Sequence, residues 1–374
     1  MTRRAFRLPV ALVPLALAAC ATQATPPSNP APVPVEAAPP AAPAAPAEAL
    51  LPKVPQPPER PVAPPSVTDP ALPLERRIDA FVDYASQMYG VDPRRIRDTL
   101  AQAQYQQSII DAISRPAEKV KPWRDYRPIF LNDARIQGGR DFYAANRAAL
   151  DRVAADTGVP APYIVAIIGV ETNYGRITGK YRVLDALYTL AFWHPKRAPF
   201  FAGELAQLFA LAKDEPQLDV LALQGSYAGA MGMGQFMPSS YRNWAKDGDG
   251  DGRRDLLDHT PDVFASIANY FVVHGWQRGG AVAARATRDP GAADFVPDEL
   301  DPVYPLSMLA ARGYRPQPGE PVAEGATLLS LDGEAGKEYW LGYRNFYVIT
   351  RYNHSPMYAL AVHQLAQAIA GGAP

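Results

Sequence analysis

The most informative stretch of the chain reads Ile164-Val165-Ala166-Ile167-Ile168-Gly169-Val170-Glu171. Seven apolar or small residues in a row favour a helix with little solvent contact, and Val159-Pro160 provides its start. The run leads directly into a carboxyl group, and a carboxyl group that loses its water favours the protonated form. Glu171 is therefore a candidate general acid. From periodicity alone, the alternative is a glutamate on the solvated face of an ordinary helix end.

Helical patterns continue on both sides of this stretch. Upstream, apolar residues at helical spacing begin at Leu74, Asp92-Pro93 opens a second helix, and residues 131–157 predict one long amphipathic helix that ends at Gly158. Downstream, the same pattern recurs at 199–213, 261–274 and 356–370. Residues 281–343 instead carry turns and short apolar runs, which favour a small β insertion. The sequence predicts a mainly α domain over residues 74–374 with a small β-containing insertion at about 281–343.

The first 73 residues read as a targeting segment and a tether. Residues 1–20 have a basic start, an apolar run too short to span a bilayer, and a cysteine at the end, Cys20. Small residues before Cys20 are typical of a bacterial lipobox, so we expect lipidation there, with a buried cysteine as the alternative. Residues 21–73 are mostly Pro and Ala, and this composition predicts a disordered linker with a reach of about 160 Å at about 3.1 Å per residue.

Composition excludes two classes of function. The 37 basic residues nearly balance the 38 acidic ones, and a net charge of −1 argues against a broad nucleic-acid-binding surface. Cys20 is the only cysteine, so the chain can form neither an intrachain disulfide nor a cysteine-based zinc site.

Residues 224–238 carry four glycines within ten residues. The segment lacks the Gly-Lys-Ser/Thr ending of a phosphate loop and the third glycine of a dinucleotide fingerprint. Its backbone can approach a ligand closely, and Ser226, Tyr227 and Gln235 offer polar contacts that suit a carbohydrate. The alternative is a flexible loop between helices, but interleaved methionine and phenylalanine side chains argue against a solvated loop.

Residues 247–258 match the twelve-residue calcium loop of EF-hands. The candidate ligands, at positions one, three, five, seven, nine and twelve, are Asp247, Asp249, Asp251, Arg253 (through its backbone carbonyl), Asp255 and Asp258. Gly252 supplies the turn at position six, and a solvated acidic turn is the alternative. Because a sensor needs paired loops, one loop favours a structural clip over a calcium switch.

Several blocks of the sequence together resemble the lytic murein transglycosylase B family. They run in family order over most of residues 120–370, and they are Gly169-Val170-Glu171-Thr172-Asn173-Tyr174-Gly175, Leu184-Asp185-Ala186-Leu187, Gly225-Ser226-Tyr227-Ala228-Gly229-Ala230-Met231-Gly232, Gly234-Gln235-Phe236-Met237-Pro238-Ser239-Ser240-Tyr241, Ala268-Asn269-Tyr270-Phe271, His274-Gly275-Trp276, Asn345-Phe346-Tyr347 and Thr350-Arg351-Tyr352-Asn353-His354-Ser355. The resemblance implies a lysozyme-like helical domain that cuts peptidoglycan, with a calcium loop and no organic cofactor.

The resemblance also implies roles for individual residues. Glu171 stands where the family has its single catalytic acid and base. The positions that match polar, aromatic and basic residues of the glycan groove are Tyr126, Lys196, Arg197, Ser226, Gln235, Tyr352 and Asn353. Lys196 departs from the family pattern, because lysine lacks the bidentate fork of the arginine that stands there in relatives.

We expect Glu171 to cleave the bond between N-acetylmuramic acid and N-acetylglucosamine and to form a 1,6-anhydro ring. The expected partners are peptidoglycan glycan strands, an outer-membrane lipid anchor and other cell-wall enzymes, and the expected state is a monomer in the periplasm, with no nucleic acid bound. Two alternatives remain open from the sequence. One is a non-catalytic peptidoglycan-binding lipoprotein that tethers the outer membrane to the wall, and the other is a calcium-sensing scaffold.

Overall fold

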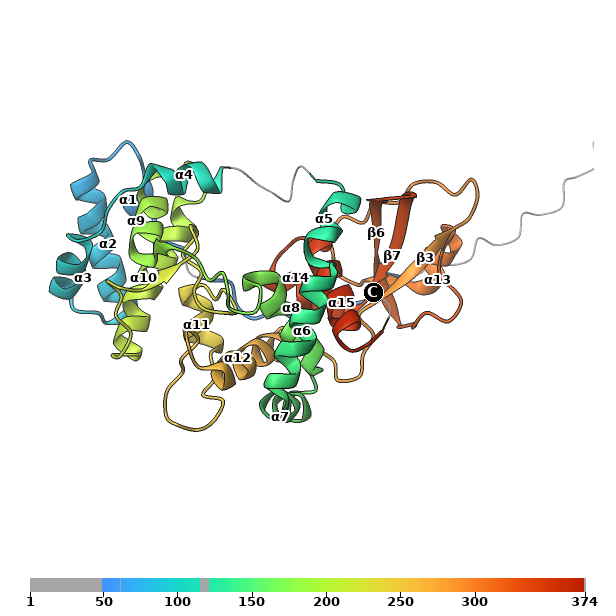
Figure 1. Cartoon of the computed structure of the whole chain (residues 1–374). Helices are drawn as coiled ribbons and strands as arrows, with labels where there is room; N and C mark the ends of the chain where they lie inside the picture. The colour runs from blue at the N-terminus through green and yellow to red at the C-terminus, as the bar shows by residue number, and fades with distance from the viewer. Residues whose placement is uncertain (1–48, 61, 115–120, 373–374) are drawn as a thin grey trace, which may run out of the picture. The chain divides into compact units, whose positions relative to one another are not determined.

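The computed structural model describes residues 49–60, 62–114 and 121–372 (Figure 1). The predicted signal peptide with Cys20, and most of the predicted linker, lie outside these residues. Within the described part the chain is mainly helical and carries a small β-sheet near its C-terminal end, which confirms the predicted fold class.

One group of helices precedes the stretch that ends at Glu171. These helices are α1 (Pro65–Thr68), α2 (Leu74–Tyr89), α3 (Pro93–Leu100), α4 (Gln107–Ile113), α5 (Trp123–Phe130), α6 (Asp133–Ala145) and α7 (Arg147–Thr157). The start of α3 follows the prediction, because the Asp92 side chain accepts a hydrogen bond from the Arg94 N–H and Pro93 occupies the first helical position.

The remaining helices begin with the stretch itself. They are α8 (Ala161–Thr172), α9 (Val183–Trp193), α10 (Ala198–Asp214), α11 (Pro238–Trp244), α12 (Thr260–Val273), α13 (Leu306–Ala311), α14 (Arg344–Tyr352) and α15 (Pro356–Ile369). Residues 164–169 of α8 are all buried, as expected for a helix that is apolar on every face. Helix α8 packs against α6, α7, α12 and α15, whereas α10 packs against α2, α9 and α11. Glu171 is thus the next-to-last residue of a helix that packs against four others.

Two small sheets complete the fold. Strands β1 (Tyr181–Arg182) and β2 (Gln224–Gly225) form an antiparallel pair. The larger sheet has the order β4-β6-β7-β3-β5, and its strands are β3 (Ala283–Arg288), β4 (Tyr304–Pro305), β5 (Tyr314–Pro316), β6 (Gly325–Gly333) and β7 (Gly336–Gly342). This sheet buries a separate apolar cluster that includes Leu309 and Tyr314. The predicted insertion over residues 281–343 therefore has its own core.

The prediction of one long helix over residues 131–157 is wrong. The structure has two helices, α6 and α7, that are separated at Asn146 (φ −116°, ψ 13°). The Asn146 side-chain amide donates to the Phe142 carbonyl at 2.9 Å, and such a local side-chain bond competes with the regular helix backbone.

The folded part begins earlier than the predicted boundary near Leu74. Residues 49–60, which we call the strap, already contact the rest of the molecule. The Leu51 N–H donates to the Val303 carbonyl at 2.7 Å, and Val54 is buried. A proline-rich composition hid this segment, because few of its side chains are apolar enough to signal packing.

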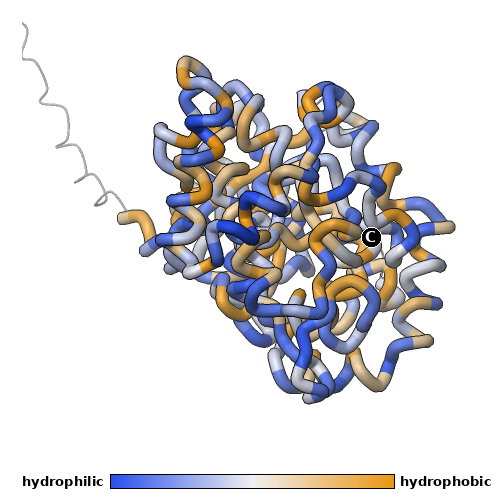
Figure 2. Tube along the Cα trace, turned by 90° about the vertical axis from the view of Figure 1, so that its left-hand side faces the viewer, coloured by the Kyte–Doolittle hydropathy of each residue, from blue (hydrophilic) through white to orange (hydrophobic). Residues whose placement is uncertain are grey.

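None of the described helices is by itself both long and apolar enough to cross a membrane; α7 and α8, which are bent at 115°, pass that test only as a pair, by length and composition. Apolar and polar residues alternate over short distances along the chain trace (Figure 2).

Candidate active site

Glu171 lies in the last turn of α8 and is half-buried. Its Oε1 atom accepts a hydrogen bond of 2.6 Å from the hydroxyl of Tyr358, a buried residue of α15. Hydrogen bonds to a carboxyl oxygen fix its direction and are stronger than those between neutral groups. The side chain is therefore held in place from a helix that is 187 positions away in the sequence.

Tyr352 and Tyr126 lie close to this pair of residues. Burial and the Glu171 carboxyl raise the pKa of Tyr352 and of Tyr358 well above the usual value for a phenol, so both stay protonated and act as donors. The Tyr352 hydroxyl donates to the Gly234 carbonyl at 2.5 Å. Tyr126 on α5 is buried and lies close enough to influence Tyr358 electrostatically. Of the predicted residues, the structure thus brings Tyr352 close to Glu171 and Tyr126 close to Tyr358, which was not predicted.

The backbone directly after Glu171 turns sharply. Asn173 (φ 51°) and Tyr174 (φ 61°) are both in the left-handed region, where residues with side chains are unfavourable. Tyr174 is tied down by its hydroxyl, which donates to the Arg135 carbonyl at 2.7 Å. Its ring fills the space beside Gly169, where a Cβ atom would come within 2.8 Å of it. The end of α8 is therefore fixed by packing.

The glycine-rich segment wraps around this turn. The Thr172 hydroxyl donates to the Met233 carbonyl at 2.9 Å. The Gln235 side-chain amide donates to the Thr178 and Gly232 carbonyls, each at 3.0 Å. Gln235 itself has a positive φ of 51°. These bonds place Gln235 beside the loop that follows Glu171.

Ser226 reaches the same loop through the small sheet. Tyr181 of β1 pairs with Gly225 of β2, and a Cβ atom at Gly179 would lie 2.0 Å from the Gly225 backbone. Only glycine permits this approach. The Ser226 Oγ accepts a hydrogen bond from the Ala230 N–H at 3.1 Å, which closes a tight turn.

A cavity of about 610 Å³ adjoins these residues. Its lining includes Gln235 and Tyr352 from the predicted set, together with Arg197. The Arg197 guanidinium lies over the Phe200 ring, 4.7 Å from its centre. Lys196 is exposed and is not among the residues that line the cavity. Asn353 follows α14 and is half-buried, with its side-chain oxygen 3.2 Å from the Ser355 N–H.

The acidic loop brings together only some of its predicted ligands. Carboxyl oxygens of Asp247, Asp249 and Asp251 lie within 4.8 Å of one another, a set of oxygen donors that fits calcium. Backbone N–H groups of Gly250 and Gly252 donate to Asp247 at 2.6 and 2.8 Å and lower the pKa of its carboxyl. Both glycines have a positive φ, which the loop requires.

The other predicted ligands lie elsewhere. Asp258 is exposed and lines a different pocket. The Asp255 carboxyl accepts hydrogen bonds from the N–H groups of Leu257 and Asp258. Arg253 is exposed, and its N–H donates to Asp251 at 2.8 Å. The structure therefore does not gather Asp255 and Asp258 with the first three aspartates.

A second cluster of candidate ligand atoms shares Asp249 with the first. Oxygen and nitrogen ligand atoms of Asp249, His259 and Asp262 also lie within 4.8 Å of one another. Asp262 is fully buried and accepts N–H bonds of 2.7 Å from Gly248 and Asp255. Asp262 was missed because it stands four positions beyond the twelve-residue pattern.

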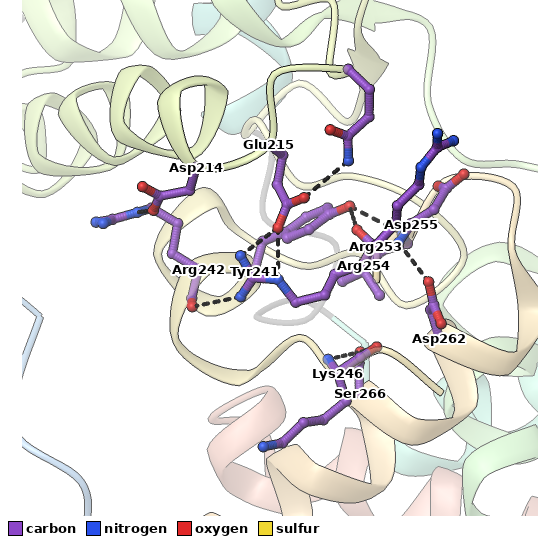
Figure 3. A network of polar contacts seen from close by, with 12 residues as sticks. Asp214, Glu215, Tyr241, Arg242, Lys246, Arg253, Arg254, Asp255, Asp262 and Ser266 are labelled. Atoms are coloured by element: carbon purple, nitrogen blue, oxygen red, sulfur yellow. Dashed lines mark hydrogen bonds and ion pairs between the residues drawn. The ribbon is translucent and has the colours of Figure 1, made fainter. Parts of the chain in front are cut away.

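The loop is anchored by a polar network that Figure 3 shows. The Arg254 guanidinium donates to Glu215 at 2.6 Å, and the Lys246 N–H donates to Ser266 of α12 at 2.8 Å. The Tyr241 hydroxyl of α11 accepts from the Leu256 N–H at 3.1 Å. A Cβ atom at Gly232 would lie 2.0 Å from the Leu256 carbonyl. The acidic loop thus packs directly against the glycine-rich segment of the site.

Comparison with known proteins identifies clear relatives. A family model described as the transglycosylase SLT domain matches residues 74–367. The chain is 44% identical over 299 residues to the membrane-bound lytic murein transglycosylase B of Escherichia coli (strain K12), which covers 78% of this chain and 81% of that protein.

Solved structures agree with the sequence comparison. Soluble lytic transglycosylase SltB1 from Pseudomonas aeruginosa has a TM-score of 0.73 at 47% identity, over 79% of this chain and 98% of that one. The Escherichia coli lytic transglycosylase Slt35, solved in complex with calcium, has a TM-score of 0.70 at 44% identity, over 78% of this chain and 92% of that one.

Proposed function

The chain belongs to the transglycosylase SLT domain family, as an enzyme that acts as a lytic murein transglycosylase, and on this premise we propose that Glu171 alone is its catalytic acid and base. In the proposed reaction, Glu171 protonates the glycosidic oxygen between N-acetylmuramic acid and N-acetylglucosamine. The muramic acetamide oxygen stabilises the positive charge that develops at C1 as this bond breaks.

The same side chain completes the reaction. Glu171, now a carboxylate, takes the proton from the C6 hydroxyl of the muramic sugar, and O6 forms a bond to C1. The product is a 1,6-anhydro ring, and Glu171 is protonated again. An intramolecular hydroxyl competes well with water because its effective concentration is high. One carboxyl group thus replaces the pair that a retaining glycosidase uses.

The observation that carries this proposal is the hydrogen bond of 2.6 Å between Tyr358 and Glu171. It aims a half-buried carboxyl group that stands at the end of a buried helix. Tyr126, Arg197, Ser226, Gln235, Tyr352 and Asn353 are the proposed contacts for the glycan strand and its peptides, and Lys196 is a proposed contact at the exposed rim.

Digestion of purified sacculi by the wild-type protein and by Glu171→Gln tests the proposal. We expect 1,6-anhydro-muropeptides as the main product by mass spectrometry, and a loss of rate of about 10²–10⁴-fold or more in the variant, the usual contribution of a general acid and base. Reducing muramic acid as the main product contradicts the anhydro route. Normal turnover by Glu171→Gln contradicts the assignment of the acid.

Calcium is the ion proposed for the acidic loop. Asp247, Asp249 and Asp251 would hold it, and its charge would offset the repulsion among their carboxylates. The oxygen-only donor set and the calcium complex of Slt35 support the choice of ion. Because the loop packs on the glycine-rich segment, the proposed role is structural.

The proposed location is the periplasm, with a lipid anchor on Cys20 in the outer membrane. The support is the small-residue run before Cys20 in the sequence and the description of the Escherichia coli relative as membrane-bound. A monomer that meets glycan strands and other cell-wall enzymes from the end of its linker is the proposed arrangement.

A further inference from the structure

The strap, residues 49–60, lies upstream of every helix in the described part of the chain and runs between distant parts of the fold. Its first residues bond to the β insertion, where the Leu51 N–H meets the Val303 carbonyl at 2.7 Å. Val54 is buried, and its side chain lies 3.0 Å from where a Cβ atom of Gly275 would stand. The last strap residue, Arg60, reaches α10 and α11. The strap therefore joins the β insertion to the helices.

Arg60 holds the end of the strap through a buried carboxylate. Its guanidinium donates to Glu204 at 3.3 Å and to the Ser240 hydroxyl at 2.9 Å, and it lies 5.5 Å from the centre of the Trp244 ring. Only 2% of the Glu204 side chain is exposed. Glu204 also accepts bonds from the N–H and hydroxyl of Ser239, at 2.9 and 2.6 Å. A carboxylate this buried needs a counter-charge, and Arg60 provides it.

The same residues line the cavity that adjoins the candidate active site. Gln56, Pro57, Pro58, Glu59 and Arg60 form part of the wall of the cavity of about 610 Å³. Gln235 and Tyr352 line it as well. Glu171 does not line it, but the Glu171 carboxyl is close enough to raise the pKa of Tyr352. Polar groups beside the aromatic rings of Phe200, Trp244 and Tyr270 suit a carbohydrate ligand.

We propose that the strap is a wall of the glycan-binding site and that Arg60 is the positioning residue that fixes this wall. The proposal rests on the proposed function, because the ligand is the peptidoglycan glycan strand that Glu171 cleaves. Two consecutive prolines restrict the strap before any ligand arrives, and a preordered wall lowers the entropic cost of binding. The wall binds substrate before and during cleavage, so it acts on affinity more than on the chemical step.

Steady-state kinetics of the full chain on soluble, uncrosslinked glycan strands test this. We expect Arg60→Met, which keeps the packing stem but loses the charge and the donors, to raise KM about five- to tenfold and to leave kcat within twofold. Arg97→Met is the matched control: it makes the same change at an arginine of α3 whose partner is the exposed Asp79 and which does not line the cavity. We expect wild-type KM for this control. An unchanged KM in Arg60→Met, or an equal loss in the control, overturns the proposal.

A double variant separates positioning from stability. Arg60→Met leaves the Glu204 carboxylate buried without its counter-charge, so it also lowers the melting temperature. Adding Glu204→Gln removes that charge and restores much of the melting temperature, while the strap remains unfastened. We expect the double variant to keep the raised KM. A return to wild-type KM shows that Arg60 acts only through stability and overturns its positioning role.

Product analysis keeps this test independent of the proposed function. If the wild-type protein makes reducing ends in place of anhydro ends, the proposed reaction fails, yet the KM comparison still reports on the strap. If anhydro ends form in every variant and KM does not change, the strap proposal fails alone.

Discussion

At the scale of single residues, the site depends on a backbone that is kept in an unfavourable conformation. Two consecutive residues with side chains, Asn173 and Tyr174, have positive φ directly after Glu171. Each costs about 1 kcal/mol or more relative to an ordinary conformation. The bond from the Tyr174 hydroxyl to Arg135, and the close fit of its ring to Gly169, hold the turn in place. Packing energy thus offsets the strain that orients the candidate acid.

Tyr358→Phe tests whether the orientation of Glu171 matters. The variant keeps the ring but removes the hydroxyl that donates to Oε1 at 2.6 Å. A hydrogen bond to a carboxylate contributes about 1.5–3 kcal/mol, so we expect kcat on glycan strands to fall roughly 10- to 100-fold.

Tyr163→Phe is the matched control for that variant. It also removes a buried hydroxyl bond, here to His363 Nδ1 at 2.7 Å, but at the opposite end of α8 from Glu171. We expect its kcat to stay near the wild-type value. Equal losses in the two variants mean that lost stability, and not the orientation of the acid, explains the effect.

The sequence pointed to Glu171 through the apolar run before it. It pointed to Gln235 and Ser226 through the four glycines that lie within ten residues of the same segment. It missed Tyr358, because residues 356–370 read as an amphipathic helix and a buried tyrosine in such a pattern is usually core. Nothing local marks Tyr358 as a partner of a residue 187 positions earlier.

At the scale of elements, the glycine-rich segment is the joint between the acidic loop and the site. Gly232 has φ of 69°, and a Cβ atom there would lie 2.0 Å from the Leu256 carbonyl. Backbone on both sides leaves no flexible group to move aside. The two segments therefore approach each other as closely as they do only because residue 232 lacks a side chain.

Gly232→Ala should lower the free energy of unfolding more than Gly279→Ala. Gly279 has nearly the same φ, 71°, but an added Cβ meets nothing within 4 Å. The control variant carries only the backbone cost of about 1–2 kcal/mol, whereas Gly232→Ala adds a steric overlap, and we expect about 3 kcal/mol or more in total. Chemical denaturation measures both. Equal losses contradict the close approach.

Calcium should stabilise the chain through the acidic loop. A site filled at about 100 times its Kd adds about 2.7 kcal/mol, so we expect saturating calcium to raise the melting temperature by roughly 3–8 °C, and a chelator to reverse the rise. Asp249→Asn should abolish the rise, because Asp249 belongs to both ligand clusters.

Asp258→Asn distinguishes the sequence pattern from the structure in the same assay. The twelve-residue pattern makes Asp258 a ligand, whereas the structure leaves it exposed and outside both clusters. We expect the calcium effect to survive this change. Its loss restores the pattern-based assignment, and an unchanged melting temperature in the wild-type protein with calcium argues against any stabilising site.

An element can be predicted from the sequence when the residues that define it are close together in the chain. Caps such as Asp92-Pro93 mark helix starts because their chemistry lies within a few residues. The break at Asn146 was hidden, because one side-chain bond divides an otherwise continuous pattern. The strand order β4-β6-β7-β3-β5 depends on contacts between distant segments, which periodicity does not encode.

At the scale of the whole molecule, the domain boundary shows the limit of composition as a guide. Residues 21–73 share one Pro/Ala-rich composition, yet their last part is held by a few specific contacts, among them Val54 and the pair of Arg60 with Glu204. One partly buried ion pair and three small buried side chains, Val54, Ala63 and Val67, are too sparse to stand out in a composition profile.

Global stability should fall in mild acid because of a buried histidine. Burial lowers the pKa of His363 to about 4, whereas in the unfolded chain it is about 6.5. Between these values the unfolded chain binds a proton that the folded chain does not. The free energy of unfolding therefore decreases as pH falls from about 6.5 to about 4, by at most ~1.4 kcal/mol per pH unit and roughly 3 kcal/mol in total.

Denaturation curves of His363→Gln against the wild-type protein measure this contribution. The test compares slopes and not the absolute stability at pH 7: the pH dependence of the variant over this window should be shallower, since glutamine does not titrate. His274, whose pKa burial also lowers to about 4, remains in both proteins and cancels in the comparison. Parallel curves for the two proteins contradict the prediction.

The docking of the strap also decides how the molecule bears a mechanical load. Residues 49–54 are fastened to the β insertion at Val303 and Glu299, and not to α2. Tension along the upstream chain would therefore peel contacts off one after another, from Leu51 towards Arg60, before it strained any helix. Contacts that separate in series give way at lower force than contacts that share the load. Detachment by pulling would thus begin at the β insertion and reach last the strap residues that line the cavity beside Gln235 and Tyr352.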